Sequence, residues 1–136
     1  MEAGMSASGY GSPALAYVGD AFFELLVREK ALSDGGRPSA QLNQMSRKYV
    51  TAVAQSALVN SLLPLLTEEE SAVYRRGRNS NSAHPPKSAG AVEYRRATGL
   101  ECLFGWLYLS GREQRARELF SAITQEVYFN VRTHRA

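Results

Sequence analysis

Cysteine and histidine are scarce in this chain of 136 residues, which contains one cysteine, Cys102, and two histidines, His84 and His134. A single cysteine cannot form a disulfide within the chain, which is typical of a protein from a reducing compartment. These three residues are also too few and too scattered to assemble a zinc site. We therefore expect Cys102 to be a small buried residue of the core.

Long apolar runs and strand-like alternation are absent as well. The N-terminus carries Glu2 and a Gly/Ser-rich stretch, which does not resemble the apolar centre of a signal peptide. The apolar run around Glu101 is too short to span a bilayer and contains a charge. No segment alternates between polar and apolar residues, and no repeat is present. These features predict an all-α cytoplasmic protein without a membrane partner.

The length of the chain fits one domain with one core. We expect residues 1–12 to form a flexible N-terminus and residues 13–136 to form the folded domain. We expect a loop over residues 77–90. The first helix is predicted from Pro13 to a turn at Ser33–Pro38, and the region from about Ser39 to Leu63 is predicted as one bent helix or two. A short helix is predicted from a capping box at Thr67 to just before Gly77. Two further helices are predicted, from near Ala91 to Ser110 and from roughly Arg112 to Val131.

Two carboxylates interrupt the apolar stripes of two long predicted helices. Asp20 lies in the first of these helices and Glu101 in the second. Burying an ionised carboxylate is costly unless a metal ion or a positive side chain compensates it. Small residues such as Gly19 would let the helices approach closely enough for both acids to share one Mg²⁺. Alternatively, each acid pairs with an arginine such as Arg28 or Arg95, and residue chemistry alone leaves both interpretations open.

Positive charge is concentrated between Arg75 and Arg96, where six Lys or Arg residues occur with one acid, Glu93. The chain as a whole is only mildly basic, with a net charge of +3 and a sequence pI of about 9.2. A charge run is often just a solvated face. An acidic site combined with a basic loop is nevertheless what a metal-dependent enzyme acting on a phosphate backbone would need.

Two motifs resemble those of the ribonuclease III family. Ala14 to Glu24, with its Tyr-Val-Gly-Asp-Ala core, resembles the family's signature helix, and Thr98-Gly-Leu-Glu-Cys-Leu-Phe-Gly resembles its second acidic motif. The chain is more closely similar to the Mini-ribonuclease III branch, which consists of the catalytic domain without a double-stranded-RNA-binding domain. The similarity covers about Leu15 to Leu109 and includes Thr67-Glu-Glu-Glu, Arg76-Gly-Arg-Asn79, Pro86-Lys87 and Tyr94-Arg95.

This resemblance implies a helical bundle that acts as a homodimeric endonuclease, cleaving double-stranded RNA with Mg²⁺ or with Mn²⁺ as a substitute. For the Mini branch it implies maturation of the precursor of large-subunit (23S) ribosomal RNA in bacteria or plastids, with a ribosomal protein as a candidate accessory. Asp20 and Glu101 match the catalytic metal ligands. The resemblance and the charge pattern together assign RNA contacts to Arg75, Arg76, Arg78, Asn79, Lys87, Tyr94 and Arg95.

Three further polar residues have auxiliary roles in this interpretation. The Thr98 hydroxyl is a candidate to complete the metal shell, and Gln55 is a candidate RNA contact. Glu24 either orients a water molecule or belongs to the dimer interface, and the structural role is favoured. Phe104 and Trp106 are expected in the core or in dimer contacts.

The full-length family carries further acids where this chain has Pro13, Ala16 and Thr98. The Mini branch shares these losses, which leave the metal shell thin and the number of metal ions open. They also support a competing interpretation, a non-catalytic helical RNA-binding module on the same fold. A third interpretation is a helical protein-interaction domain that does not bind RNA.

Overall fold

The computed structural model describes residues 7–35, 38–80 and 90–135 of the chain. All regular elements in these ranges are helical, which confirms the predicted all-α class. They are η1 (Ala7–Gly9), α1 (Ser12–Ser33), α2 (Ser39–Val50), α3 (Ala52–Leu62), η2 (Leu63–Leu65), α4 (Glu68–Arg78), α5 (Ala91–Leu109) and α6 (Glu113–Arg135). None of the described helices has the length and apolarity that crossing a membrane requires.

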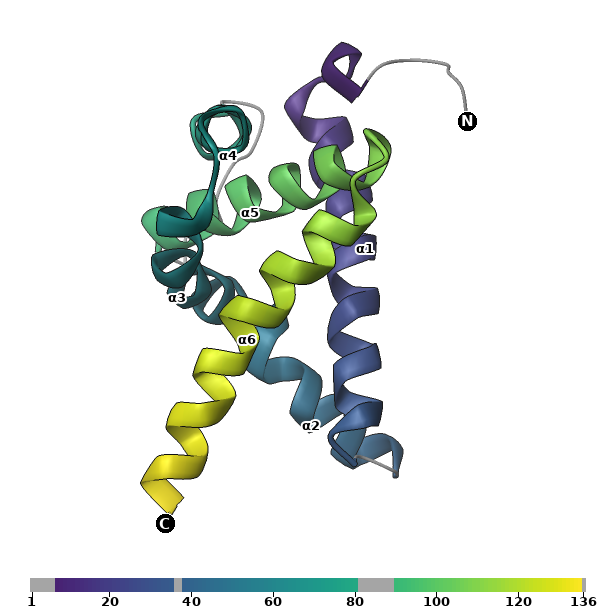
Figure 1. Ribbon diagram of the computed structural model, residues 1–136, viewed down its shortest axis with the longest axis vertical. Helices are drawn as coiled ribbons and strands as arrows, with labels where there is room; N and C mark the ends of the chain where they lie inside the picture. The colour runs from purple at the N-terminus through teal and green to yellow at the C-terminus, as the bar shows by residue number, and fades with distance from the viewer. Residues whose placement is uncertain (1–6, 36–37, 81–89, 136) are drawn as a thin grey trace.

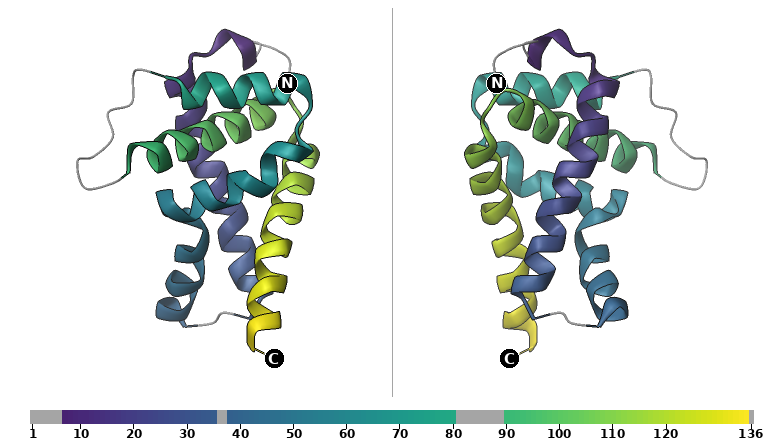
Figure 2. Two further views of the ribbon diagram at one scale, coloured as in Figure 1. Left: turned by 90° about the vertical axis from the view of Figure 1, so that its left-hand side faces the viewer. Right: turned by 90° about the vertical axis from the view of Figure 1, so that its right-hand side faces the viewer.

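Helix α5 lies at the centre of the bundle and packs against α1, α3, α4 and α6. Figure 1 shows α5 crossing α1, and the side views of Figure 2 show α4 lying alongside α5. Leu100, Leu103, Phe104 and Leu107 of α5 are all fully buried. The second half of α5, from Gly99 to Leu107, is buried apart from Glu101, which explains why this half is almost entirely apolar whereas the first half carries charged residues.

The core residues of α5 confirm three expectations from the sequence. Phe104 and Trp106 are buried, and the Phe104 ring packs edge-on against Phe23 at a centroid distance of 5.3 Å. Cys102 is buried too, and its thiol donates a hydrogen bond to the Ser12 carbonyl at 3.2 Å. Burial raises the pKa of the Cys102 thiol to about 11, so this cysteine is an inert packing residue.

The crossing of α1 and α5 depends on a pair of glycines, one on each helix. A Cβ atom at Gly19 would overlap the carbonyl oxygen of Glu101, and a Cβ atom at Gly105 would overlap the carbonyl oxygen of Leu15. The backbones therefore touch directly, without side chains between them. This close approach sets how near the functional groups of the two helices come to each other.

The region from Ser39 to Leu63 forms two helices, α2 and α3, which decides between the two forms predicted. The break lies at Thr51, whose backbone is extended with φ −75° and ψ 157°. The Thr51 hydroxyl accepts a hydrogen bond from the Ala54 N–H at 3.1 Å and so caps the start of α3. A capping residue thus redirects the chain between the two helices.

The structure corrects three boundaries. Helix α4 continues through Gly77 to Arg78, because this glycine lets α4 approach Cys102 closely and does not end the helix. Residues 7–12, expected within a flexible N-terminus, include η1 and the buried Ala7. The last helix runs to Arg135, beyond the predicted end at Val131. The expected loop over residues 77–90 mostly lies outside the described residues.

The glycine crossing gives a stability prediction. Gly19→Ala should lower the free energy of unfolding by about 3 kcal/mol or more, because the added methyl meets backbone that cannot move without separating α1 from α5. Gly11→Ala is the matched control, since a Cβ atom there has no neighbour closer than 3.6 Å. The control should cost at most about 1 kcal/mol in urea denaturation. Equal effects of the two substitutions would contradict this account of the crossing.

Candidate active site

The carboxyl groups of Asp20 and Glu101 meet at the glycine crossing of α1 and α5. Asp20 directly follows Gly19, and the Glu101 backbone is the part of α5 that Gly19 contacts. The two carboxyl groups interact through both charge and a hydrogen bond. The structure therefore brings together the two acids that the sequence singled out, although they belong to helices far apart along the chain.

The exposure of these acids differs from the expectation that both are buried. Glu101 is half-buried, whereas Asp20 is exposed. The reason is the helical geometry of α1, in which successive residues are rotated by about 100° about the axis. Gly19 faces α5, so its neighbour Asp20 lies at the edge of the contact and reaches solvent. The pair is thus accessible to a ligand from one side.

The environment of Glu101 strongly disfavours its ionised form. Burial and then the negative charge of Asp20 raise the pKa of Glu101 from 4.5 to about 8, while a hydrogen bond from Gln55 acts in the opposite direction. No arginine or lysine is among the groups that set this pKa. Near neutral pH the metal-free site therefore holds a proton on Glu101 where a cation would otherwise balance the charge.

The arginine pairing considered as an alternative is not formed. Arg28 donates to Glu24 at 2.6 Å within α1, so its charge is engaged one turn away from Asp20. Arg95 is exposed and does not contribute to the pKa of Glu101. The same contact shows that Glu24 forms an ion pair on the surface of α1.

Gln55 and Thr98 lie close to the acid pair in different ways. Gln55 is only 3 % exposed, and its side chain hydrogen-bonds to Glu101. The sequence suggested an RNA contact for Gln55, and the structure places its side chain in the interior, next to Glu101. Thr98 is half-buried on α5, and its hydroxyl donates to the Tyr94 carbonyl at 3.0 Å. The Thr98 oxygen retains lone pairs for a second interaction.

The predicted RNA-binding residues occupy the end of α4 and the start of α5. Arg75 and Arg76 are exposed, and the charge of Arg76 lowers the pKa of Cys102, the residue next to Glu101. Arg76 therefore lies close to the buried face of α5 at Cys102, although it is not among the groups that set the pKa of Glu101. Asn79 is exposed, Tyr94 is half-buried, and Lys87 lies outside the described residues.

Arg78 and Arg95 share a surface pocket with a third arginine. The pocket has a volume of about 260 Å³, and Arg96 also lines it. Arg78 lies over the Tyr74 ring at 5.7 Å, and Arg96 donates to the Asn60 side chain at 2.6 Å. Arg96 was not assigned a role from the sequence, where its membership of the basic segment was the only available signal. Among the residues that the structure describes, no acid lines this pocket.

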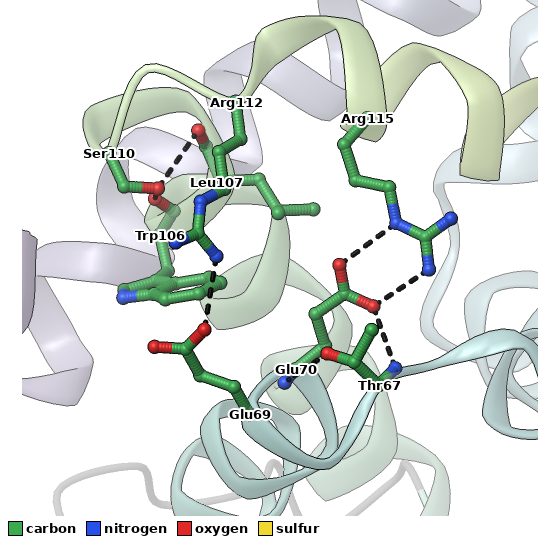
Figure 3. Close-up of polar contacts among 8 residues, drawn as sticks. All are labelled: Thr67, Glu69, Glu70, Trp106, Leu107, Ser110, Arg112 and Arg115. Carbon is green, nitrogen blue, oxygen red and sulfur yellow. Dashed lines mark hydrogen bonds and ion pairs between the residues drawn. The ribbon is translucent and has the colours of Figure 1, made fainter.

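The N-terminus of α4 is anchored by Glu70, which is 3 % exposed (Figure 3). The predicted capping box is confirmed: the Thr67 N–H donates to Glu70 at 2.9 Å, and the Glu70 N–H donates to the Thr67 hydroxyl at 3.2 Å. Arg115 of α6 donates to both Glu70 carboxyl oxygens, at 2.8 and 2.9 Å. This guanidinium lowers the pKa of Glu70, so the pair stays ionised and joins α4 to α6.

A second contact supports the same junction. Arg112 donates to Glu69 at 3.1 Å and lies over the Trp106 ring at 4.8 Å. Figure 3 shows the Arg112 guanidinium over the Trp106 indole, with a dashed line to the Glu69 carboxylate. Together with Arg115, Arg112 holds the helix that carries the basic residues in a defined orientation.

The comparisons with known proteins agree with this arrangement. The family model described as the ribonuclease III domain matches residues 13–112. The chain therefore belongs to the ribonuclease III family, whose members are endoribonucleases. The interval contains both carboxylates, the anchored helix α4 and the described basic residues.

Within the family, the resemblance to Mini-ribonuclease III is confirmed. The chain is 45% identical to Mini-ribonuclease 3 of Symbiobacterium thermophilum over 108 residues, which cover 79% of this chain and 83% of the relative. It is 41% identical to Mini-ribonuclease 3 of Enterococcus faecalis, with coverages of 84% and 88%. An X-ray structure of a Fusobacterium nucleatum protein has a TM-score of 0.76 at 29% identity, covering 86% of this chain and 93% of that one.

The raised pKa of Glu101 predicts a specific pH dependence of stability. Because the folded protein binds this proton more tightly than the unfolded chain, the resulting stabilisation is complete below about pH 4.5 and is lost as the pH rises through about 8. In chelator, Glu101→Gln should therefore lose less stability than the parent across this interval, as measured by urea denaturation. For Asp20→Asn, the decrease of stability with pH should be intermediate, because Glu101 remains buried but no longer faces the charge of Asp20. Identical slopes for all three proteins would contradict the assignment.

Proposed function

We propose that this chain is a Mg²⁺-dependent endoribonuclease that cleaves double-stranded RNA, with Mn²⁺ as a substitute for Mg²⁺. The observation that carries this proposal is the pair of carboxylates, Asp20 and Glu101, brought together with no arginine or lysine among the described groups that act on Glu101. The pair is accessible from solvent through Asp20 and lies beside a helix that carries basic residues. These are the elements needed to hold a cation and a phosphate backbone.

The donor set fits a hard divalent cation. Mg²⁺ binds carboxylate oxygens and retains several waters, so two acidic ligands are sufficient. Within the described part of the chain, no group of three or more His, Cys, Asp or Glu residues is placed to hold a metal. Asp20 and Glu101 would hold the cation, and the Thr98 hydroxyl lies one turn from Glu101. When bound, the cation would polarise a phosphoryl oxygen and lower the pKa of the attacking water.

The chain's own residues supply the remaining requirements of the reaction. Asp20 and Glu101 provide the negative charge that localises the cation, and α1 and α5 hold them in place through backbone contact. Arg76 interacts electrostatically with Cys102, the residue next to Glu101, while Arg78, Arg95 and Arg96 line a pocket whose described lining residues include no acid. Arginines arranged in this way would bind phosphates of an A-form duplex, which is recognised by its shape and backbone.

A homodimer would place two such sites on one duplex, one for each strand. The exposed face of α1 supports this arrangement, because Tyr17, Leu25 and Leu32 are 82 %, 49 % and 54 % exposed. These residues lie within about 80° of one another around the helix axis. Tyr108 of α5 is also 46 % exposed and packs against Phe22. An apolar face of this kind is suited to self-association.

The biological substrate follows from the resemblance to Mini-ribonuclease 3. We infer that the chain matures the precursor of 23S ribosomal RNA in the bacterial cytoplasm, with a ribosomal protein as a candidate accessory. The support is the bacterial origin of the relatives and their similarity over most of the chain.

Loss of either carboxylate should abolish cleavage. Asp20→Asn and Glu101→Gln should each lower turnover of a long duplex RNA in Mg²⁺ on the order of a thousandfold or more, because the cation loses a ligand. The double variant should be no worse than either single variant, since residues that act as one unit are non-additive. Binding of RNA in chelator should be retained. A parent protein that binds duplex RNA but never cleaves it would instead favour the non-catalytic RNA-binding module.

The basic residues of α4 should contribute to affinity and leave the acidic site intact. Arg76→Ala combined with Arg78→Ala should weaken duplex RNA binding and flatten the dependence of log affinity on log salt by somewhat under one unit per lost phosphate contact. Turnover at saturating RNA should largely recover. The exposed pair on α2, Arg47→Ala with Lys48→Ala, is the matched control. A salt slope that changes equally in both double variants would remove α4 from the RNA-binding surface.

A further inference from the structure

Gln55 occupies an unusual position for a polar side chain. It lies in the first turns of α3, where its N–H donates to the Thr51 carbonyl at 2.9 Å. Helix α3 packs against α5, and Gln55 is only 3 % exposed. A buried amide is costly unless it is hydrogen-bonded. The partner of this amide is the carboxyl group of Glu101. The extended backbone at Thr51 starts α3 in the direction that brings Gln55 beneath the site.

The contact between Gln55 and Glu101 differs chemically from the one made by Glu70, the buried acid of α4. Glu70 is neutralised by Arg115, which donates to both of its carboxyl oxygens. Glu101 instead receives a neutral amide, which donates a hydrogen bond without cancelling the charge of the carboxylate. An arginine in place of Gln55 would remove the negative charge that a cation needs. A neutral donor fixes the orientation of Glu101 and leaves that charge available.

We propose that Gln55 is a positioning residue, which holds the Glu101 carboxyl group in the orientation that binds the divalent cation. This inference rests on the proposed function, since it concerns the same cation site. Groups that hydrogen-bond to metal-binding carboxylates typically change metal affinity by roughly ten- to a hundredfold when they are removed. Gln55 does not touch the substrate in this interpretation, and it acts through Glu101 alone.

The test is a Mn²⁺ titration of the RNA-free protein, followed by electron paramagnetic resonance, with Mg²⁺ as competitor. Gln55→Met removes the amide at nearly constant volume and should weaken binding of both ions roughly ten- to a hundredfold. The Mg²⁺ concentration for half-maximal RNA cleavage should rise by the same factor, while turnover at saturating Mg²⁺ recovers. Affinity for duplex RNA in chelator should be unchanged. A purely structural defect would lower turnover without shifting the metal dependence.

Two further variants keep the test decisive. Ser56→Ala removes the neighbouring buried hydroxyl of α3 and should leave metal affinity at the parent value. Gln55→Asn keeps an amide but withdraws it from Glu101 by one methylene, so it should also weaken Mn²⁺ binding. This variant provides the test if Gln55→Met does not fold. Folding of each variant is checked by circular dichroism. Parent-like Mn²⁺ affinity in the folded Gln55 variants would overturn the inference.

The outcomes for the inference and for the proposed function can be separated. Suppose that the parent protein binds Mn²⁺, that Asp20→Asn abolishes this binding, and that the parent does not cleave RNA. The proposed function then fails, and the Mn²⁺ titrations still test the role of Gln55. If the parent cleaves duplex RNA and the Gln55 variants keep full Mn²⁺ affinity, only the inference fails. If no Mn²⁺ binding depends on Asp20, both are wrong.

Discussion

The direct backbone contact between α1 and α5 is the constraint on which the rest of this structure depends. Gly19 and Gly105 permit it, because a methyl group at either position would overlap a carbonyl oxygen of the opposing helix. The contact brings two carboxyl groups from distant parts of the chain close enough to interact by charge and by hydrogen bonding. A side chain at the crossing would separate the helices and leave two independent surface acids with ordinary properties.

The acid pair differs from the described carboxylates that form ion pairs with arginine. Glu24, Glu29, Glu69 and Glu70 each contact an arginine, at distances from 2.6 to 3.1 Å. The three exposed pairs, those of Glu24, Glu29 and Glu69, contribute little to stability, about 0–1 kcal/mol each, whereas Glu70 is buried. No arginine is among the described groups that set the pKa of Glu101, and burial followed by the charge of Asp20 raises this pKa. Such a deficit of positive charge at one solvent-accessible place is what a cation site requires.

Helix α5, which carries Glu101, also orients the basic surface. Helix α4 packs on α5 through Gly77 and is tied to α6 by the Glu70–Arg115 pair. The C-terminal turn of α4 therefore carries its arginines at a fixed place relative to Glu101. A rigid connection between an acidic and a basic region suits a duplex, whose phosphates are spaced by a regular helix.

Much of the fold was predictable from local sequence signals. Apolar periodicity predicted the long helices, and Thr67 with Glu70 predicted the start of α4. Asp20 and Glu101 stood out because ionisable residues are costly inside apolar helices. Gly77 misled the prediction of the end of α4, because a glycine that ends a helix and one that admits a neighbouring helix have the same local sequence signal.

Only the tertiary structure decided how these residues meet. Helical periodicity tells which residues share a face, but it does not tell which helix covers that face or at what angle. For this reason the exposure of Asp20, the placement of Gln55 beneath Glu101 and the pairing of Arg115 with Glu70 were not predictable. Each depends on contacts between segments far apart in the chain. The sequence alone therefore determined the helical class and the two acids, whereas the packing of α3 and α1 on α5 determined the environment in which those acids lie.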